Sequence, residues 1–254
     1  MNIENITVNS FDERRDLLIP GDETATLDLC IRHFVSCARG AIESHGAFFV
    51  ALSGGSTPKA LYQKVTTSPY SEQIDWEKVY LFWGDERSIP PDHADSNFKM
   101  AMEAGFDQMP IPKEHIFRMI AEENIEENAL KYEEKIQENL KDRPFDLVIL
   151  GMGEDGHTAS LFPQTEGLKA KDRLVIANFI PQKNTWRMSL TYEAINSSLN
   201  IAIYVIGAAK KNILEEVLTS ELQPERYPIQ LIGTKENKAL WIIDKAAAPE
   251  ITNK

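Results

Sequence analysis

Several features that mark other classes of protein are scarce in this chain or absent from it. Only two of its 254 residues are cysteines, which excludes a fold held together by a framework of disulfides. The longest apolar runs, such as Ile201 to Gly207, are far too short to cross a bilayer. The amino terminus has no basic segment followed by an apolar stretch, so we expect no signal peptide and no membrane partner. Together with an ordinary apolar content, this predicts a cytoplasmic protein that forms one domain over residues 1–254.

The two cysteines are Cys30 and Cys37, seven residues apart in a helical pattern. This spacing places them on one helix face but too far apart along the helix for a disulfide. We therefore expect two buried thiols in a reducing compartment.

Positive charge is also in deficit, with 27 Lys and Arg against 39 Asp and Glu and a net charge of −12. Such an acidic chain is not expected to bind nucleic acid. Much of the acidity falls in the stretch from Asn124 to Lys141, which has the pattern of a helix with a solvated face. A small anionic ligand is not excluded, because local donors decide its binding and salt screens charges beyond about 8–10 Å.

Motifs for several common chemistries are missing. The five histidines form no HxxH or HExxH pair and the cysteines form no CxxC, so no metal and no cofactor are expected. Neither a GxxxxGK[ST] phosphate loop nor a GxGxxG dinucleotide turn is present. A GxSxG motif is lacking too, so a serine nucleophile is unsupported and Ser160 is expected to be structural.

The segment richest in chemical information begins with the apolar run Asp146–Leu150, which predicts a strand buried on both faces. A glycine-rich loop follows and carries Glu154, Asp155 and His157. In an α/β sheet, ligands bind at loops that follow the carboxyl ends of strands, so this histidine and its carboxylates are candidates for acid–base chemistry. Thr158–Phe162 is expected to open a short helix. The alternative is that His157 is a plain turn residue.

A second strand, Ala47–Leu52, leads into a loop of small and hydroxyl residues and then into a helix from Pro58. Backbone N–H and hydroxyl donors at a helix N-terminus suit a phosphate, although a turn without a ligand is also common. The donors are Ser53, Gly54, Gly55, Ser56 and Thr57.

A third strand, Val79–Trp83, is followed by Asp85, Glu86 and Arg87. Three charges at the end of a strand are costly to bury without partners. Taken alone, the segment fits a cleft and a wet surface about equally well.

Strands and helices alternate along the chain, which predicts an α/β fold with a mostly parallel sheet flanked by helices on both faces. A small antiparallel addition around Arg173–Tyr192 is expected to cover part of the site. The other expected helices are 24–44, 97–104, 124–141 and 210–218, and the other expected strands are 115–119, 173–178, 187–191 and 200–206.

Taken together, the segments resemble the 6-phosphogluconolactonase family over roughly residues 20–250. The resemblance implies a Rossmann-like fold of the sugar-phosphate isomerase and lactonase type. It also implies hydrolysis of 6-phospho-D-glucono-1,5-lactone in the oxidative pentose phosphate pathway by a monomer or homodimer. The matching patterns are Leu52–Pro58, Trp83–Pro90, Asp95–Asn97, Gly151–Pro163, Arg187–Thr191, Gly207–Lys210, Pro224–Pro228 and Trp241–Lys245.

The same resemblance implies roles for individual residues. His157 would be the general base, oriented by Asp155 or Glu154. Arg87 or N–H groups of the glycine loops would stabilise the oxyanion. The phosphate would be held by the Ser53–Thr57 loop, Arg187 and Lys210. Lys183 is a further candidate for substrate binding, although Pro181-Gln-Lys-Asn-Thr departs from the Pro-Lys-Pro-Pro-like stretch of the family.

Two other functions compete with this one. Glucosamine-6-phosphate deaminases share the phosphate loop and the histidine core, but they continue with a glutamate-bearing turn that is replaced here by Phe162 and Pro163. The other is a non-catalytic sugar-phosphate sensor, such as the effector domain of a transcription regulator. Two features argue against it: the chain has no room for a separate DNA-binding module, and it is acidic.

Overall fold

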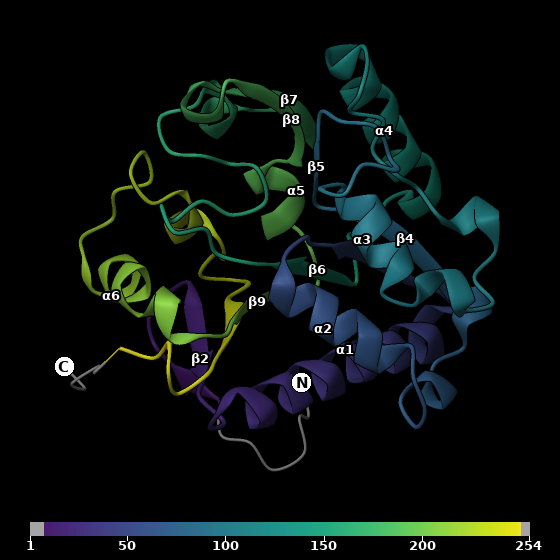
Figure 1. Cartoon of the computed structure of the whole chain (residues 1–254), viewed down its shortest axis with the longest axis horizontal. Helices are drawn as coiled ribbons and strands as arrows, with labels where there is room; N and C mark the ends of the chain where they lie inside the picture. The colour runs from purple at the N-terminus through teal and green to yellow at the C-terminus, as the bar shows by residue number, and fades with distance from the viewer. Residues whose placement is uncertain (1–7, 250–254) are drawn as a thin grey trace.

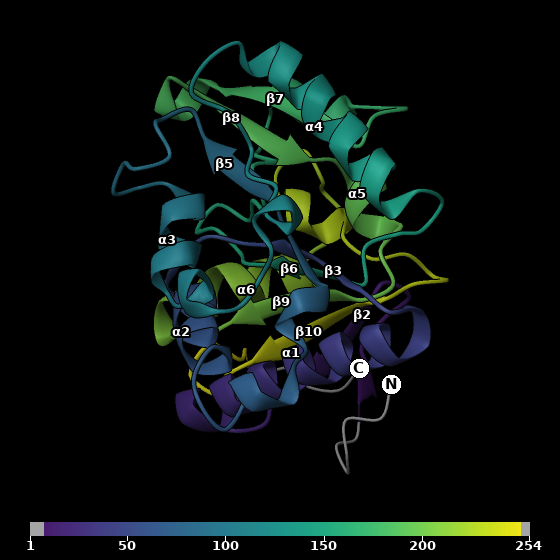
Figure 2. The same cartoon turned by 90° about the vertical axis from the view of Figure 1, so that its right-hand side faces the viewer.

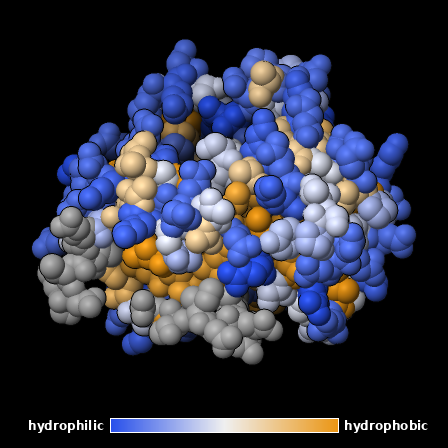
Figure 3. All heavy atoms as spheres, turned by 60° about the horizontal axis from the view of Figure 1, so that its bottom comes forward, coloured by the Kyte–Doolittle hydropathy of each residue, from blue (hydrophilic) through white to orange (hydrophobic). Residues whose placement is uncertain are grey.

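The computed structural model describes residues 8–249. The amino-terminal stretch in which no signal peptide is expected lies outside this range. No helix of the described residues is long and apolar enough to span a membrane. Figure 3 shows hydrophilic residues over most of the face it presents, with an apolar area in the lower part.

Within residues 8–249 the main sheet has seven strands in the order β1-β2-β10-β9-β6-β3-β4, and only β1 pairs antiparallel with its neighbour. Every residue of β3, β6, β9 and β10 is buried, as expected of parallel strands covered on both faces. The strands are β1 (Asn9–Ser10), β2 (Arg15–Leu18), β3 (Phe48–Leu52), β4 (Val79–Trp83), β6 (Leu147–Leu150), β9 (Ile201–Val205) and β10 (Ala239–Ile243).

Six α-helices surround the two sheets of the described chain (Figures 1 and 2). Helices α1 and α2 pack side by side along the main sheet, whereas α4 packs on the second, smaller sheet. This arrangement confirms the predicted α/β class. The helices are α1 (Glu23–His45), α2 (Ser56–Val65), α3 (Asn97–Glu103), α4 (Ile125–Leu140), α5 (Tyr192–Asn196) and α6 (Lys211–Thr219).

Helix α1 forms where the apolar spacing predicted it. Asp22 caps its N-terminus by accepting a hydrogen bond from the Ala25 N–H at 2.9 Å, and Gly46 ends it in the left-handed region at φ 85°. Cys30 and Cys37 lie on its buried face as free thiols, so the predicted burial and the predicted lack of a disulfide between them are confirmed. Burial raises the pKa of Cys37 to about 12 and raises that of Cys30 further.

His33 is fully buried on the same face of α1, and this predicts a dependence of stability on pH. Its Nδ1 lies 2.8 Å from the Tyr204 hydroxyl, and burial lowers the pKa of His33 to about 4. Between about pH 6.5 and 4 the unfolded chain therefore binds a proton at this position that the folded chain does not. The contribution of neutral His33 to the free energy of unfolding is therefore complete above pH 6.5, and it decreases as the pH falls through this window.

We expect the free energy of unfolding to fall by about 3 kcal/mol more in the wild type than in a His33→Gln variant between pH 6.5 and 4. Urea unfolding at a series of pH values measures this difference. Parallel curves for the two proteins would contradict this, because they would show that His33 takes up its proton as readily in the folded chain as in the unfolded one.

The predicted antiparallel addition is present as a three-stranded sheet in the order β5-β8-β7. Its strands are β5 (Asp85–Arg87), β7 (Val175–Ile180) and β8 (Thr185–Leu190). The two sheets meet where Gly84 accepts a hydrogen bond from the Leu190 N–H and donates one to the Leu52 carbonyl, both at 2.8 Å. The small sheet is thereby fixed above the carboxyl ends of β3 and β4.

Two predicted elements are wrong. The expected strand at 115–119 is reduced to a single bridge between Ile116 and Leu81 that follows a 3-10 turn, so the segment adds no strand to the sheet. The expected helix at Thr158–Phe162 is instead a tight turn closed by a bridge between Thr158 and Leu161. Ala159 at its centre has φ 47°, a left-handed conformation that an α-helix cannot contain.

Candidate active site

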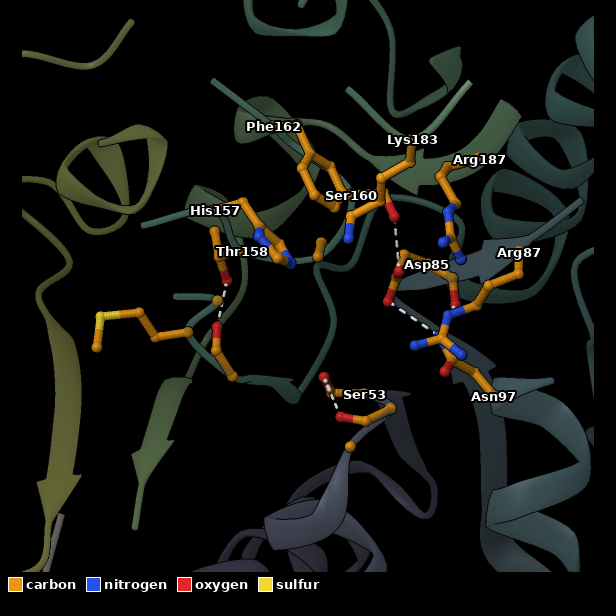
Figure 4. Close-up of a pocket in the computed structure, with 16 residues that line it drawn as sticks. Ser53, Asp85, Arg87, Asn97, His157, Thr158, Ser160, Phe162, Lys183 and Arg187 are labelled. Atoms are coloured by element: carbon orange, nitrogen blue, oxygen red, sulfur yellow. Dashed lines mark hydrogen bonds between the residues drawn. The ribbon is translucent and has the colours of Figure 1, made fainter. Parts of the chain in front are cut away.

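A pocket of about 270 Å³ lies at the carboxyl ends of β3, β4 and β6, under the small antiparallel sheet (Figure 4). Its position agrees with the rule that open α/β sheets bind ligands beyond the carboxyl ends of their strands. Of the residues predicted for the site, those that line the pocket are Ser53, Gly54, Gly55, Arg87, His157, Lys183 and Arg187.

The His157 imidazole is held in place by the loop that follows β6. Its Nδ1 contacts the carboxylate of Asp155, and the same carboxylate accepts a hydrogen bond from the His157 N–H at 3.1 Å. A Cβ at position 153 would lie 2.0 Å from His157 Nδ1, so only glycine leaves room for the ring there. The nitrogen Nε2 is left for the pocket.

Asp155 rather than Glu154 is the carboxylate that meets His157. Both carboxylates are exposed and neither lines the pocket, so the contact with Nδ1 is what distinguishes Asp155. Burial raises the pKa of Asp155, but the hydrogen bond and charge of His157 outweigh this and hold it below its ordinary value. Asp155 therefore stays ionised at neutral pH and favours the tautomer with the proton on Nδ1.

The other face of the site is the loop between β3 and α2. Gly55 precedes α2 with φ 106°, and no side chain caps the first turn of that helix. The Tyr62 hydroxyl fixes Ser53 through hydrogen bonds to its N–H and carbonyl, both at 2.9 Å. A Cβ on Gly54 would lie 1.9 Å from Asn97 Oδ1, so glycine is required for the loop to pass. Uncapped N–H groups of this kind bind anions.

Ser56 and Thr57 are the first two residues of α2 and do not line the pocket. The predicted donor loop is therefore divided, with three of its residues on the pocket wall and two in the helix behind it.

Two arginines stand opposite each other on neighbouring strands of the small sheet. Arg87 of β5 and Arg187 of β8 are register partners, and both line the pocket. Burial lowers the pKa of Arg187, and the positive charge of Arg87 lowers it further. The Arg187 Nε is buried and has no hydrogen-bond partner among the described residues. An anion bound beside these two guanidinium groups would offset their mutual repulsion and accept a hydrogen bond from the free Nε.

The acidic residues beside Arg87 are buried with partners. Glu86 accepts hydrogen bonds from the backbone N–H groups of Arg87, Asn97 and Phe98 and so holds the start of α3. Burial raises its pKa, and these hydrogen bonds oppose the rise. Asp85 lines the pocket and accepts from Asn97 Nδ2 at 3.2 Å. The segment therefore forms a cleft wall rather than a wet surface.

Ser160 joins the histidine loop to the small sheet. Its hydroxyl donates to Asp85 at 2.7 Å, its carbonyl accepts from Asn178 at 2.9 Å, and its N–H donates to the Ser189 hydroxyl at 3.1 Å. All three partners lie on strands of the small sheet. These bonds support the structural role expected of Ser160.

The two predicted lysines lie differently. Lys183, at the tip of the β7–β8 hairpin, lines the pocket. Lys210 does not line it, and its ammonium donates to the carbonyl of Met152, a residue of the pocket wall, at 2.8 Å. Lys210 is therefore adjacent to the cavity and bonded to its wall.

Several lining residues were not assigned a role from the sequence, and three of them, Asp85, Asn97 and Phe162, make contacts that shape the site. The ring of Phe162 stacks on the His157 imidazole, with 3.9 Å between centroids and 18° between planes. All three belong to segments that the sequence singled out, but their contacts join residues far apart in the chain, which periodicity does not reveal. Among residues 8–249, no group of three or more His, Cys, Asp or Glu is arranged to hold a metal.

The amino-acid sequence is similar to those of known proteins. A family model described as glucosamine-6-phosphate isomerases/6-phosphogluconolactonase matches residues 21–241. A 6-phosphogluconolactonase of Chlamydia pneumoniae is 39% identical over 238 residues, which cover 93% of this chain and 91% of the relative. One from Nostoc is 37% identical over 237 residues, covering 91% and 96%.

The fold is also similar to that of a solved structure that bears the same name. The crystal structure of 6-phosphogluconolactonase from Thermotoga maritima superimposes with a TM-score of 0.76 at 32% identity, covering 91% of this chain and 99% of that one. The family model spans most of the sequence, and the relatives match along nearly their whole length. The chain belongs to the glucosamine-6-phosphate isomerase/6-phosphogluconolactonase family.

Proposed function

We propose that this protein hydrolyses 6-phospho-D-glucono-1,5-lactone to 6-phospho-D-gluconate, as the names of its relatives indicate. The observation that carries the proposal is the content of one pocket. A histidine held by a carboxylate faces the same cavity as an uncapped helix N-terminus and two arginines. The first group can activate water, and the other two can hold a phosphate.

In the proposed reaction, neutral His157 accepts a proton at Nε2 from a water that attacks C1 of the lactone. Asp155 holds the Nδ1 proton and stabilises the imidazolium that forms. The tetrahedral intermediate then collapses with cleavage of the bond between C1 and the ring oxygen. The imidazolium returns its proton to that oxygen as it leaves, so the ring opens and His157 becomes neutral again.

The phosphate is assigned to the end of the pocket that contains Arg187 and the Ser53–Gly55 loop. Arg187 has a buried Nε without a partner, and the N-terminus of α2 has no side-chain cap. A dianion at this place pairs with both and separates the like charges of Arg187 and Arg87. Lys210 at Met152 is the outer member of the same positive group.

For the oxyanion we propose the N–H groups of the glycine loops, with Arg87 adding positive charge from the phosphate side. The Arg87 guanidinium already donates to the Asp95 carbonyl, and its register partner is Arg187, which lies at the phosphate end. Donors to an oxyanion lower the barrier by about 3–4 kcal/mol each where they have been measured.

Among the alternatives, the deaminase reaction needs several coordinated acid–base groups to move protons between C1 and C2. In this pocket the glutamate-bearing turn of the deaminases is replaced by Phe162, which packs on His157. A single base, a water and an oxyanion site are sufficient for a lactone.

We expect turnover of fresh 6-phosphogluconolactone above its spontaneous hydrolysis and no release of ammonia from glucosamine 6-phosphate. A coupled assay for 6-phosphogluconate and an ammonia assay on the same preparation measure both. Ammonia formation at a comparable rate would transfer the site to the deaminase class. If neither substrate were turned over, the non-catalytic sugar-phosphate sensor would be the remaining alternative.

The remaining proposals are broader. We propose a single domain over residues 1–254, supported by the hydrogen bonds that join the two sheets at Gly84. A cytoplasmic location is supported by the two free buried thiols, and a small-molecule substrate without nucleic acid by the net charge of −12. We also propose that the protein is a monomer or a homodimer. All the residues that line the candidate site come from one chain.

A further inference from the structure

The turn that replaces the expected helix after His157 has a consequence for the histidine itself. Thr158 and Leu161 bridge each other across a left-handed Ala159, so the chain reverses within four residues. The reversal returns Phe162 to His157, five residues earlier in the sequence. A helix would have carried the position 162 side chain more than one turn away along its axis.

Two contacts restrict the imidazole in different directions. Asp155 holds Nδ1 and thereby one edge of the ring. The face of the ring is set by Phe162, which lies nearly parallel to it at 3.9 Å. If the contact with Asp155 were the only one, the imidazole could still rotate about the axis of that hydrogen bond. This rotation would turn Nε2 away from the substrate. A near-parallel neighbour blocks this rotation.

Phe162 is itself held rigidly. Its side chain is 4% exposed, and the Thr165 hydroxyl donates to its carbonyl at 2.8 Å. The Lys183 ammonium lies 5.8 Å from the centroid of the same ring, within the range of a cation–π contact. Figure 4 shows His157, Phe162 and Lys183 on the same side of the pocket. The hairpin tip and the histidine loop therefore meet at this phenylalanine.

We propose that Phe162 is a positioning residue for His157, which keeps Nε2 aimed at the attacking water without contacting the reacting atoms. The proposal rests on the proposed lactonase function. A ring with a flat face is needed at this position, and an aliphatic side chain of similar volume is not a substitute.

The test compares Phe162→Leu with Phe162→Tyr, which keeps the ring. Phe162→Leu should lower kcat about 10- to 100-fold with little change in KM, because small errors in the placement of a catalytic group have effects of this size. Phe162→Tyr should retain most of the wild-type kcat. The control is Phe179→Leu, which removes an exposed phenylalanine of β7 that does not line the pocket, and it should leave kcat unchanged.

Two further measurements separate positioning from a merely structural role. In a His157→Ala background, Phe162→Leu should cause almost no additional loss, since its effect passes through His157. The ring-current shift of the His157 carbon-bound protons, measured by NMR, should disappear in Phe162→Leu and persist in Phe162→Tyr.

A full additional loss in the His157→Ala background would overturn the proposal, and so would wild-type kcat in folded Phe162→Leu. A rise in KM alone would assign Phe162 to substrate binding instead. Failure of the proposed function is recognised separately, because the wild type would then have no lactonase activity while the NMR shift would still report the stack.

Discussion

Replacing His157 with alanine should lower kcat for 6-phosphogluconolactone by about 10²- to 10⁴-fold, the usual contribution of a general base. The imidazole is partly exposed on a loop and adds little to the core, so the protein should fold normally. Binding of 6-phosphogluconate should be nearly unchanged, because the phosphate contacts that we propose involve other residues, Arg187 and the Ser53–Gly55 loop. Initial rates corrected for spontaneous hydrolysis and a calorimetric binding measurement check both statements.

The pH profile offers a second view of the same residue. The pKa of Asp155 is held below its ordinary value, so this carboxylate stays ionised well below neutral pH. We expect wild-type activity to fall at acid pH while Asp155 is still ionised, which assigns the fall to a group other than this carboxylate. Near-wild-type kcat in folded His157→Ala would remove this histidine from the mechanism.

Arg187→Ala should have the second largest effect, on the KM for the phosphorylated lactone. Hydrogen bonds to charged groups contribute roughly 1.5–3 kcal/mol, so KM should rise about 10- to 100-fold. Lys210→Ala should raise it less, because Lys210 is already bonded to Met152 and lies outside the pocket lining. Both variants should change the hydrolysis of unphosphorylated gluconolactone far less, since that substrate offers the two cations no partner.

The control for this series is Arg226→Ala, an exposed arginine that does not line the pocket and should leave KM unchanged. Equal losses on phosphorylated and unphosphorylated lactone would mean that Arg187 serves folding or the reacting carbonyl, and the phosphate would have to be placed elsewhere.

Much of the main sheet could be predicted because its central strands are continuous apolar runs. Phe48–Leu52 and Ile201–Val205 are buried along their whole length, and a run of that kind reads as a strand without knowledge of its neighbours. Strands β1, β2 and β10 of the main sheet were not predicted; in β1 and β2, two to four mixed residues carry no period.

Strand β5 shows the opposite case. Its sequence is Asp-Glu-Arg, and no propensity favours a strand there. Glu86 is buried because the start of α3 supplies two N–H donors to it and Arg87 a third, and Asp85 because Ser160 and Asn97 donate to it. Partners so distant in the chain cannot be read from local pattern, although the crowding of charge marked the place.

The histidine loop was found from its glycines and carboxylates, but its details depend on the turn. The sequence could not choose between Glu154 and Asp155, because both are within two or three residues of His157. Only the backbone path brings Asp155 to Nδ1. The left-handed Ala159 was equally hidden, since alanine favours helix and the bonds of Ser160 that help to hold the turn reach residues of the small sheet far away in the chain.

The proposed site is tested most directly by a crystal structure of the protein with 6-phosphogluconate. We expect the phosphate at the N-terminus of α2, bonded to N–H groups of the Ser53–Gly55 loop and to Arg187. We also expect the C1 carboxylate beside Nε2 of His157, with Phe162 still stacked on the ring. A product bound with its carboxylate at Arg187 and its phosphate at His157, or bound outside this pocket, would contradict it.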